Sequence, residues 1–259
     1  MSELNQLESL FTQGKITRRE FVRKMSALGV MAAVSPAVSL LPAEAATPKR
    51  GGRFRAGVDH FHTADSLDPA TLSNFGMCFI NCQLRNNLVE VDGKGNAVPE
   101  LAETMEPSAD AAVWRFALRK GVEFHNGKSL KAEDVIYSIN HHRGEKTKSG
   151  AKSLAAQIKD IRADGKYTVI FELAAGNADF PFILGDYHIR IYPDGTTGQD
   201  WEKGIGTGGY ILENWEPGVK AITKRNPNYF KSDRAHFESV ETLAISDVNA
   251  RSNALKTKR

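Results

Sequence analysis

Apolar and polar residues alternate near the middle of the chain. Trp114, Phe116 and Leu118 are separated by polar or small residues, which places their side chains on one face of a predicted strand. The segments 120–121 and 125–128 follow, and each carries a glycine that accepts the positive φ angle of a tight turn. The pattern therefore predicts a half-buried strand, a turn, a short strand and a second turn.

The spacing of apolar residues becomes helical directly afterwards. Val135, Ile136 and Ile139 recur at helical intervals from Ala132 onward. Two acidic residues stand in the first turn of this segment, where the helix dipole favours anions. A helix is therefore predicted to begin at Ala132.

The rest of the chain is assigned by the same reasoning. A strand is predicted over 53–58 with Phe54, Ala56 and Val58 facing inward, and a helix over 71–87 with one apolar side formed by Leu72, Phe75, Phe79, Ile80 and Leu84. The remaining predicted elements are hairpins over 88–98 and 158–173, a strand pair around 108–110, a short helix over 179–184, paired strands over 207–215 and 219–224, a strand over 240–245 and a helix over 249–256. So many hairpins, without an internal repeat, indicate a mixed α/β fold rather than regular βαβ winding.

Paired arginines followed by an uncharged stretch mark the amino terminus. Arg18 and Arg19 precede the segment 25–41, which carries no charge, and Ala43-Glu44-Ala45 then offers the small residues that a signal peptidase requires. The uncharged segment is rich in alanine, serine and glycine and is too weakly hydrophobic for a permanent membrane span. Residues 1–45 are therefore predicted to be a twin-arginine signal peptide, which places the mature protein in the periplasm.

Composition excludes few classes of function. The 259 residues contain 41% hydrophobic and 25% charged residues, as in an ordinary soluble protein. A net charge of +3, with both signs interspersed, gives no argument for a nucleic acid partner. The two cysteines, Cys78 and Cys82, cannot build a disulfide framework, and we expect two small buried side chains at these positions.

Three blocks of sequence carry a resemblance. The first block is Pro99-Glu100-Leu101-Ala102-Glu103, followed by the run from Leu118 to Val135 and by Tyr137-Ser138. The second block is Gly206-Thr207-Gly208-Gly209-Tyr210, followed by Trp215 and Pro217-Gly218. The third block is Arg225-Asn226-Pro227-Asn228-Tyr229. In this order and spacing they resemble the family 5 solute-binding proteins, the extracytoplasmic receptors of peptide, nickel and opine ABC importers. The resemblance covers roughly residues 51–255.

The resemblance implies a fold and a division into lobes. The fold is a periplasmic-binding-protein-like type II fold of the peptide-binding subclass, with a mixed sheet and an inserted hairpin-rich lobe. Lobe I comprises residues 46–79 and 203–259, and lobe II comprises residues 80–202. Family members are considerably longer, so we expect a C-terminally truncated chain that lacks the third lobe and binds its ligand weakly.

The same resemblance implies the function. The chain is predicted to be the substrate-binding component of an ABC importer, a monomer without enzymatic activity or cofactor that captures a peptide-like solute between lobes for an inner-membrane permease. By position at strand ends, the predicted ligand contacts are Thr63, Asp65, Ser66, Ile205, Gly206 and Thr207. Dipeptide, longer peptide, opine, nickel chelate and sugar all stay open as ligands.

Other interpretations stay open beside this one. His60 and His62 after the first strand form a pair that metal-dependent hydrolases use for zinc, although such a site needs further ligands. We expect the other histidines, His141 and His142 among them, to be solvated or to line the cleft rim. Trp114 and Trp215 are expected in the core, and Trp201 stays open. A structural accessory module or a non-functional gene fragment would also fit a shortened chain.

Overall fold

The computed structural model describes residues 3–13, 15–17, 20–21, 23–24 and 48–257, which fall into two units, Met1–Pro48 and Lys49–Arg259. The first unit contains helix α1 (Glu3–Thr12), and the rings of Phe11 and Phe21 stack with centroids 4.7 Å apart. Arg18, Arg19 and the uncharged segment of the predicted signal peptide lie outside the described residues. None of the described helices has the length and apolarity that crossing a bilayer requires.

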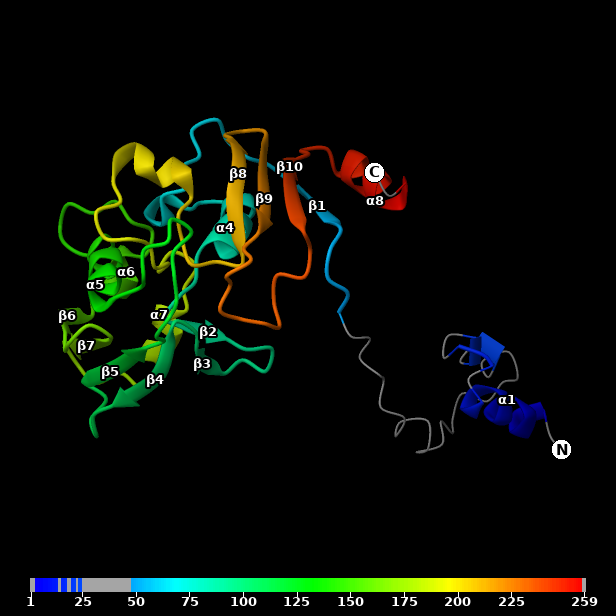
Figure 1. The fold of residues 1–259 in the computed structure, drawn as a ribbon, viewed down its shortest axis with the longest axis horizontal. Coiled ribbons are helices and arrows are strands. Elements are labelled where there is room, and N and C mark those ends of the chain that lie inside the picture. Colours follow the sequence, from blue (N-terminus) through cyan, green and yellow to red (C-terminus); the bar gives the residue numbers. More distant parts are fainter. Residues whose placement is uncertain (1–2, 14, 18–19, 22, 25–47, 258–259) are drawn as a thin grey trace. The chain divides into compact units, whose positions relative to one another are not determined.

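A four-stranded mixed sheet joins segments from both ends of the second unit (Figure 1). It consists of β1 (Arg53–Val58), β8 (Tyr210–Glu216), β9 (Lys220–Arg225) and β10 (Ser239–Ala244) in the order β1-β10-β9-β8. Strand β1 runs parallel to β10, with Arg53 opposite Ser239, and the other neighbours are antiparallel. The predicted lobe boundaries stay a prediction, but β1 does pair with the last strand.

A second four-stranded sheet contains the strand predicted around Trp114. Its order is β4-β5-β7-β6, all antiparallel, with β4 (Ala102–Pro107), β5 (Val113–Leu118), β6 (Ile158–Ala163) and β7 (Thr168–Leu173). A hairpin of β2 (Val89–Val91) and β3 (Ala97–Pro99) precedes it. The hairpins over 88–98 and 158–173 and the strand pair around 108–110 were predicted from turns and alternation, and these predictions are confirmed.

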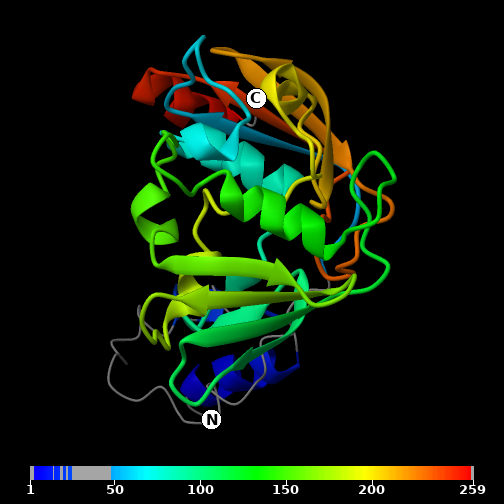
Figure 2. The same cartoon turned by 90° about the vertical axis from the view of Figure 1, so that its left-hand side faces the viewer.

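Helices cover the sheets on the sides where the two sheets approach each other. In Figure 2, α4 (Phe75–Leu84) covers the β1-β10-β9-β8 sheet, and α5 (Ala132–Asn140) covers the β4–β7 sheet. The other helical segments are η1 (Pro69–Thr71), α6 (Lys152–Ala155), α7 (Phe180–Leu184), η2 (Gly198–Lys203) and α8 (Val248–Thr257). The predicted turns are confirmed, since Gly121 and Gly127 have φ of 77° and 82°.

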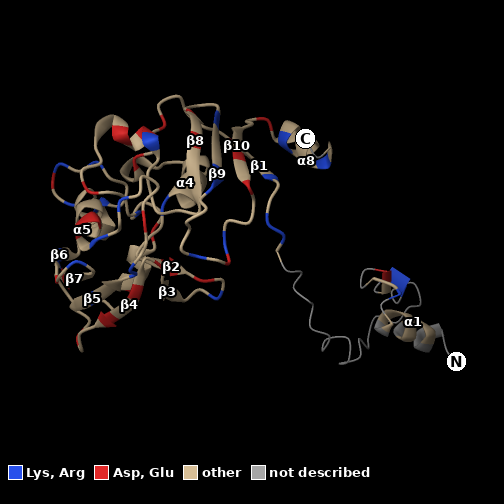
Figure 3. Cartoon of the chain, viewed as in Figure 1, with Lys and Arg blue, Asp and Glu red and all other residues tan. Residues whose placement is uncertain are grey.

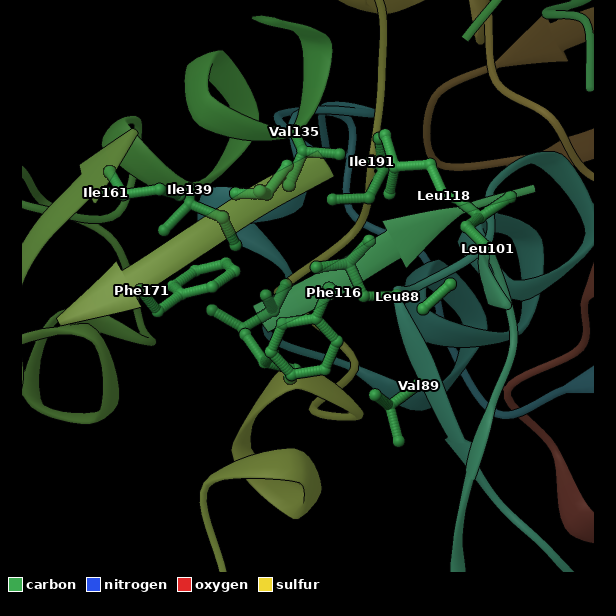
Figure 4. Close-up of a cluster of buried hydrophobic side chains, with 14 of the residues drawn as sticks. Leu88, Val89, Leu101, Phe116, Leu118, Val135, Ile139, Ile161, Phe171 and Ile191 are labelled. Atoms are coloured by element: carbon green, nitrogen blue, oxygen red, sulfur yellow. The ribbon is translucent and has the colours of Figure 1, made fainter. Parts of the chain in front are cut away.

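The larger hydrophobic core lies between α5, α7 and the β4–β7 sheet (Figure 4). Phe116 from β5 and Phe171 from β7 are completely buried and meet edge to face, with ring centroids 5.4 Å apart. Val135 and Ile139 from α5 complete this core at the helical spacing read from the sequence. A smaller core of Val58, Leu67, Ile80, Leu84 and Ala221 holds α4 against the mixed sheet.

The helix predicted over 71–87 is shorter than expected. Asn74 caps its start by accepting a hydrogen bond from the Met77 N–H at 2.9 Å, and Arg85 ends it in an extended conformation with φ −137°. The start at Asn74 turns Phe75 outward, with 69% of its surface exposed, so the prediction that Phe75 faces the core was wrong.

Four further side chains differ from the predictions. Phe54 is exposed and stacks on Phe237 instead of facing inward, because the inner face of β1 is covered only near Val58. Neither cysteine is buried: Cys78 is half-buried at the edge of the smaller core, and Cys82, one turn further along α4, is exposed and contacts Arg190. Trp215 is half-buried, with its ring edge against Phe61, whereas Trp114 is buried as predicted.

The burial of Phe116 gives a direct test of the core. We expect Phe116→Ala to lower the free energy of unfolding by about 3–5 kcal/mol in urea denaturation, because a cavity replaces a completely buried ring. The matched substitution Phe75→Ala removes an exposed ring and should cost well under half as much. Equal costs for the two substitutions would contradict this description of the core.

Candidate ligand-binding site

Asp65, one of the predicted ligand contacts, organises the loop after β1. Its carboxylate accepts hydrogen bonds from the His62 N–H at 2.7 Å and from the Asn74 side-chain amide at 3.2 Å. Since Asn74 caps α4, the loop and the helix start are tied together through this one carboxylate. Asp65 is half-buried and is therefore held in place by its own loop.

Ser66 links this loop to the crossover segment, which we define as residues 202–209. The Ser66 hydroxyl donates to Glu202 at 2.9 Å, and the same carboxylate accepts a hydrogen bond from the Trp215 indole N–H at 2.6 Å. Thr63 is exposed and lies against the turn between β8 and β9, where a Cβ on Gly218 would come within 2.9 Å of it. The three predicted contacts of the first group therefore lie next to elements of the mixed sheet.

The glycines of the crossover segment allow its backbone to pass close to the end of α4. A Cβ on Gly206 would lie 2.1 Å from the Leu84 carbonyl oxygen, and one on Gly208 would lie 2.2 Å from the Gln83 carbonyl oxygen. Thr207 is also buried, and its hydroxyl donates to the Asn86 side chain at 3.0 Å. In this conformation Ile205 alone of the second predicted group is partly exposed.

Arg85 connects the two groups and was not predicted from the sequence. Its side chain is completely buried, and it donates to the Leu67 carbonyl at 2.6 Å and to the Ile205 carbonyl at 3.2 Å. It also donates to the Asn81 side chain, and the Trp201 ring centroid lies 5.9 Å from its guanidinium carbon. The loop after β1 and the crossover segment are therefore held by one cation.

The electrostatics of Arg85 are unusual for a buried cation. Burial lowers the pKa of Arg85 to about 10, which leaves the group protonated at neutral pH. Its Nη2 has no hydrogen-bond partner among the described residues. Carbonyl and amide oxygens, rather than a carboxylate, supply its hydrogen bonds. A charged residue at the end of an apolar helix was the only sequence signal for it.

A histidine cluster joins the same loop to α5 and the segment after α7. His141 meets the Asp68 carboxylate at 2.8 Å, and His188 lies 3.1 Å from the Leu72 carbonyl oxygen and 2.8 Å from the Asp186 carboxylate. The His142 ring lies 2.6 Å from the Ser149 hydroxyl. His142 and His188 are buried, so the expectation that the histidines are solvated or line the cleft rim was wrong for both. The turn of the chain after Asn140 places His142 under the segment 149–151 instead of in solvent.

The possible zinc pair does not acquire further ligands. His60 lies 3.0 Å from the Asp59 carboxylate, and the rings of His60 and His62 are 5.0 Å apart. Among the described residues no group of three histidine, cysteine or acidic side chains is placed to hold a metal ion. The metal-dependent hydrolase therefore gains no support from the geometry.

Trp201, whose role the sequence left open, is buried and packs against Arg85 and Tyr192.

A family model of bacterial extracellular solute-binding proteins, family 5 Middle, matches residues 96–259. The match spans more than half of the chain, and the chain belongs to this family.

Relatives in this family include peptide receptors. The chain is 26% identical over 222 residues to the oligopeptide-binding protein AppA of Bacillus subtilis, which covers 80% of this chain and 39% of AppA. It is 28% identical over 200 residues to a probable di/tripeptide-binding protein of Pseudomonas aeruginosa, with 67% of this chain and 38% of that protein covered. The chain thus spans about two fifths of the length of these relatives.

Solved structures confirm the predicted fold class. The structure of Bacillus subtilis AppA with a nonapeptide matches with a TM-score of 0.74 at 23% identity, covering 82% of this chain and 43% of AppA. The structure of Helicobacter pylori DppA with the peptide STSA matches with a TM-score of 0.72 at 24% identity, over 82% of this chain and 46% of DppA. At this identity the matches establish the peptide-binding-protein fold.

The role of Arg85 can be tested by exchange. We expect Arg85→Ala to accelerate hydrogen exchange in peptides covering residues 62–68 and 204–209, because each carbonyl left without its donor costs about 1–3 kcal/mol. Peptides from β4–β7 should keep their exchange rates. Arg115→Ala, which removes a half-exposed guanidinium paired with Asp164, serves as the control and should leave both segments unchanged. Unchanged exchange in Arg85→Ala would contradict the bridging role.

His142 gives the protein a sensitivity to acid. Burial, with the neighbouring His141 adding to it, lowers the pKa of His142 to about 4 from its usual 6.5. The unfolded chain therefore takes up this proton at a higher pH than the folded chain, and stability falls as the pH drops from about 6.5 to about 4. The loss attributable to His142 is on the order of 3 kcal/mol.

We expect His142→Gln to lose less stability than the parent protein between neutral pH and about pH 4, measured by urea denaturation at each pH. His62→Gln changes an exposed histidine and should keep the parent profile. If His142→Gln and the parent lose stability in parallel, His142 is not the group that resists protonation.

Proposed function

We propose that this protein is the substrate-binding component of an ABC importer for peptides or related small solutes, exported by its twin-arginine signal to the periplasm. The family membership of residues 96–259 carries the proposal. The likeness of the fold to AppA, whose structure holds a nonapeptide, supports a peptide-like ligand. In this role the protein is a monomer that delivers solute to an inner-membrane permease and needs no catalytic group.

Within that function, the residues described here form one side of the binding cleft. Thr63 is exposed beside the mixed sheet, and Asp65, Ser66 and Ile205 are partly exposed on neighbouring loops, so these four side chains supply the accessible part of the contact surface. Gly206 and Thr207 support it from below through their contacts with Leu84 and Asn86.

The energetics of closure explain why one side of a cleft binds weakly. A ligand moves a hinge from mostly open to mostly closed only by binding the closed form about 10⁴-fold more tightly, roughly 5.5 kcal/mol. That preference arises from contacts made to both sides at once. Contacts to one side alone are made equally in both states and contribute nothing to closure.

The test uses the full chain and a simple peptide. We expect millimolar trialanine to shift the NMR resonances of residues 63–66 and 205, with a dissociation constant weaker than micromolar, while glucose shifts none of them. Thr63→Val should reduce these shifts because it removes an exposed hydroxyl, and Thr104→Val on the outer face of β4 should not. Absence of any shift would contradict the proposed function. Micromolar affinity for this chain alone would contradict only its assignment to one side of the cleft.

A further inference from the structure

A cavity of about 490 Å³ lies beside the β2–β3 hairpin. We call it the hairpin cavity. Its walls come from α4, from β2 and from the loop 229–235 between β9 and β10. Phe79 and Tyr229 contribute aromatic surface, and none of the six predicted ligand contacts lines it. Its size falls within the range typical of sites for small organic ligands.

One wall of the hairpin cavity is electrically balanced. Figure 3 shows positive and negative residues on both the β2–β3 hairpin and the loop between β9 and β10. Lys231 on the loop donates to Glu90 at 2.9 Å and to Glu100 at 2.7 Å, and Arg234 lies 3.5 Å from Glu90. Burial by itself lowers the pKa of Lys231, but the Glu100 carboxylate and the hydrogen bonds to Glu100 and Glu90 outweigh it and hold that pKa above its usual value. These two cations and two anions satisfy one another.

Arg190, which also lines the cavity, has no such partner. Among residues 48–257 no carboxylate lies at ion-pair distance from its guanidinium, because Asp186, four residues earlier, pairs with His188 at 2.8 Å instead. Arg190 donates to the carbonyls of Tyr187 and Arg85, each at 3.3 Å, longer than the usual distance of about 2.9–3.0 Å. Its remaining contact is the Cys82 sulfur at 2.7 Å. The cavity therefore carries one cation in excess.

We propose that the hairpin cavity is a second binding site, which takes a small organic acid with an aromatic or apolar body. The carboxylate lies against the Arg190 guanidinium, whose planar fork suits two oxygens. The apolar body packs between Phe79 and Tyr229. A carboxylate supplies the missing counter-charge, and the balanced wall around Lys231 offers no second free cation. The site is independent of the peptide-binding function proposed above.

Cys82 provides a reporter for the site. It is exposed, it lines the cavity and it touches Arg190, whereas Cys78 is half-buried and does not line the cavity. With iodoacetamide, the Cys82 sulfur displaces iodide from the methylene carbon, a C–S bond replaces the C–I bond, and the thiol proton passes to the buffer. The rate at each cysteine is read by peptide mass mapping of the full chain.

We expect benzoate to slow this alkylation several-fold and saturably at Cys82 while leaving Cys78 unchanged. Benzamide, the neutral analogue of the same shape, and sodium chloride at equal ionic strength should not slow it. Arg190→Gln should abolish the protection, and Arg190→Lys, which keeps the charge but loses the fork, should retain part of it. Arg115→Gln removes a guanidinium far from the cavity and should keep full protection.

Several results would overturn the proposal. Equal protection by benzoate and benzamide would show that charge plays no part, and absence of protection by benzoate in the parent protein would show that the cavity takes no such acid. Protection that persists in a folded Arg190→Gln would assign the binding elsewhere. Should Arg190→Gln fail to fold, as judged by circular dichroism, the comparison of benzoate with benzamide in the parent protein and in Arg190→Lys still decides the question.

Discussion

A single buried guanidinium holds the predicted ligand-binding surface together. Arg85 joins the loop after β1 to the crossover segment through the carbonyls of Leu67 and Ile205. Removing a cation from water is costly, and here carbonyl and amide oxygens with the face of Trp201 offset that cost without a carboxylate. Such an arrangement tolerates little displacement, because each lost contact leaves a buried polar group without a partner. The loop after β1 and the crossover segment are therefore held in a fixed position relative to each other.

A second set of polar contacts fixes the same loop from its other side. The pairing of Asp68 with His141 and the approach of His188 to the Leu72 carbonyl tie the loop to α5 and to the segment after α7. The backbone of Gly150 adds a hydrogen bond to the Ala70 carbonyl at 3.0 Å. This loop, which follows β1 of the mixed sheet, is thus tied to helix α5 and its neighbours on the β4–β7 sheet, and relative motion between them would break polar contacts that are partly or completely buried. In a receptor that closes around its ligand, a rigid side is what allows binding energy to act on the hinge elsewhere.

The hairpin cavity differs from this surface in its chemistry. The proposed peptide-binding surface presents hydroxyl groups and a carboxylate on loops that are satisfied by their own hydrogen bonds. The hairpin cavity combines aromatic side chains with the unpaired cation of Arg190. None of the six predicted ligand contacts lines the hairpin cavity, so the two surfaces differ in residues as well as in charge.

The sequence by itself determined the local elements and the family. Alternation in β5 and β7, helical spacing in α5 and glycines at the turns each depend on neighbours along the chain, and the structure has these elements where they were predicted. Three blocks of sequence in the right order sufficed for the family 5 membership and the fold class. The six ligand contacts, chosen by position at strand ends, stay a prediction.

Only the tertiary structure decided which polar residues are buried and what they contact. Arg85 and His142 look like surface residues in the sequence. Arg85 is buried because the crossover segment, distant along the chain, closes over it, and His142 is buried where the chain turns back to Ser149. Arg190 meets Cys82 across 108 residues, and this distance along the chain hides the hairpin cavity from any local pattern. Whether a charged side chain is buried and which group it pairs with depend on its neighbours in space. Those neighbours are known only from the folded structure, because they come from distant parts of the sequence.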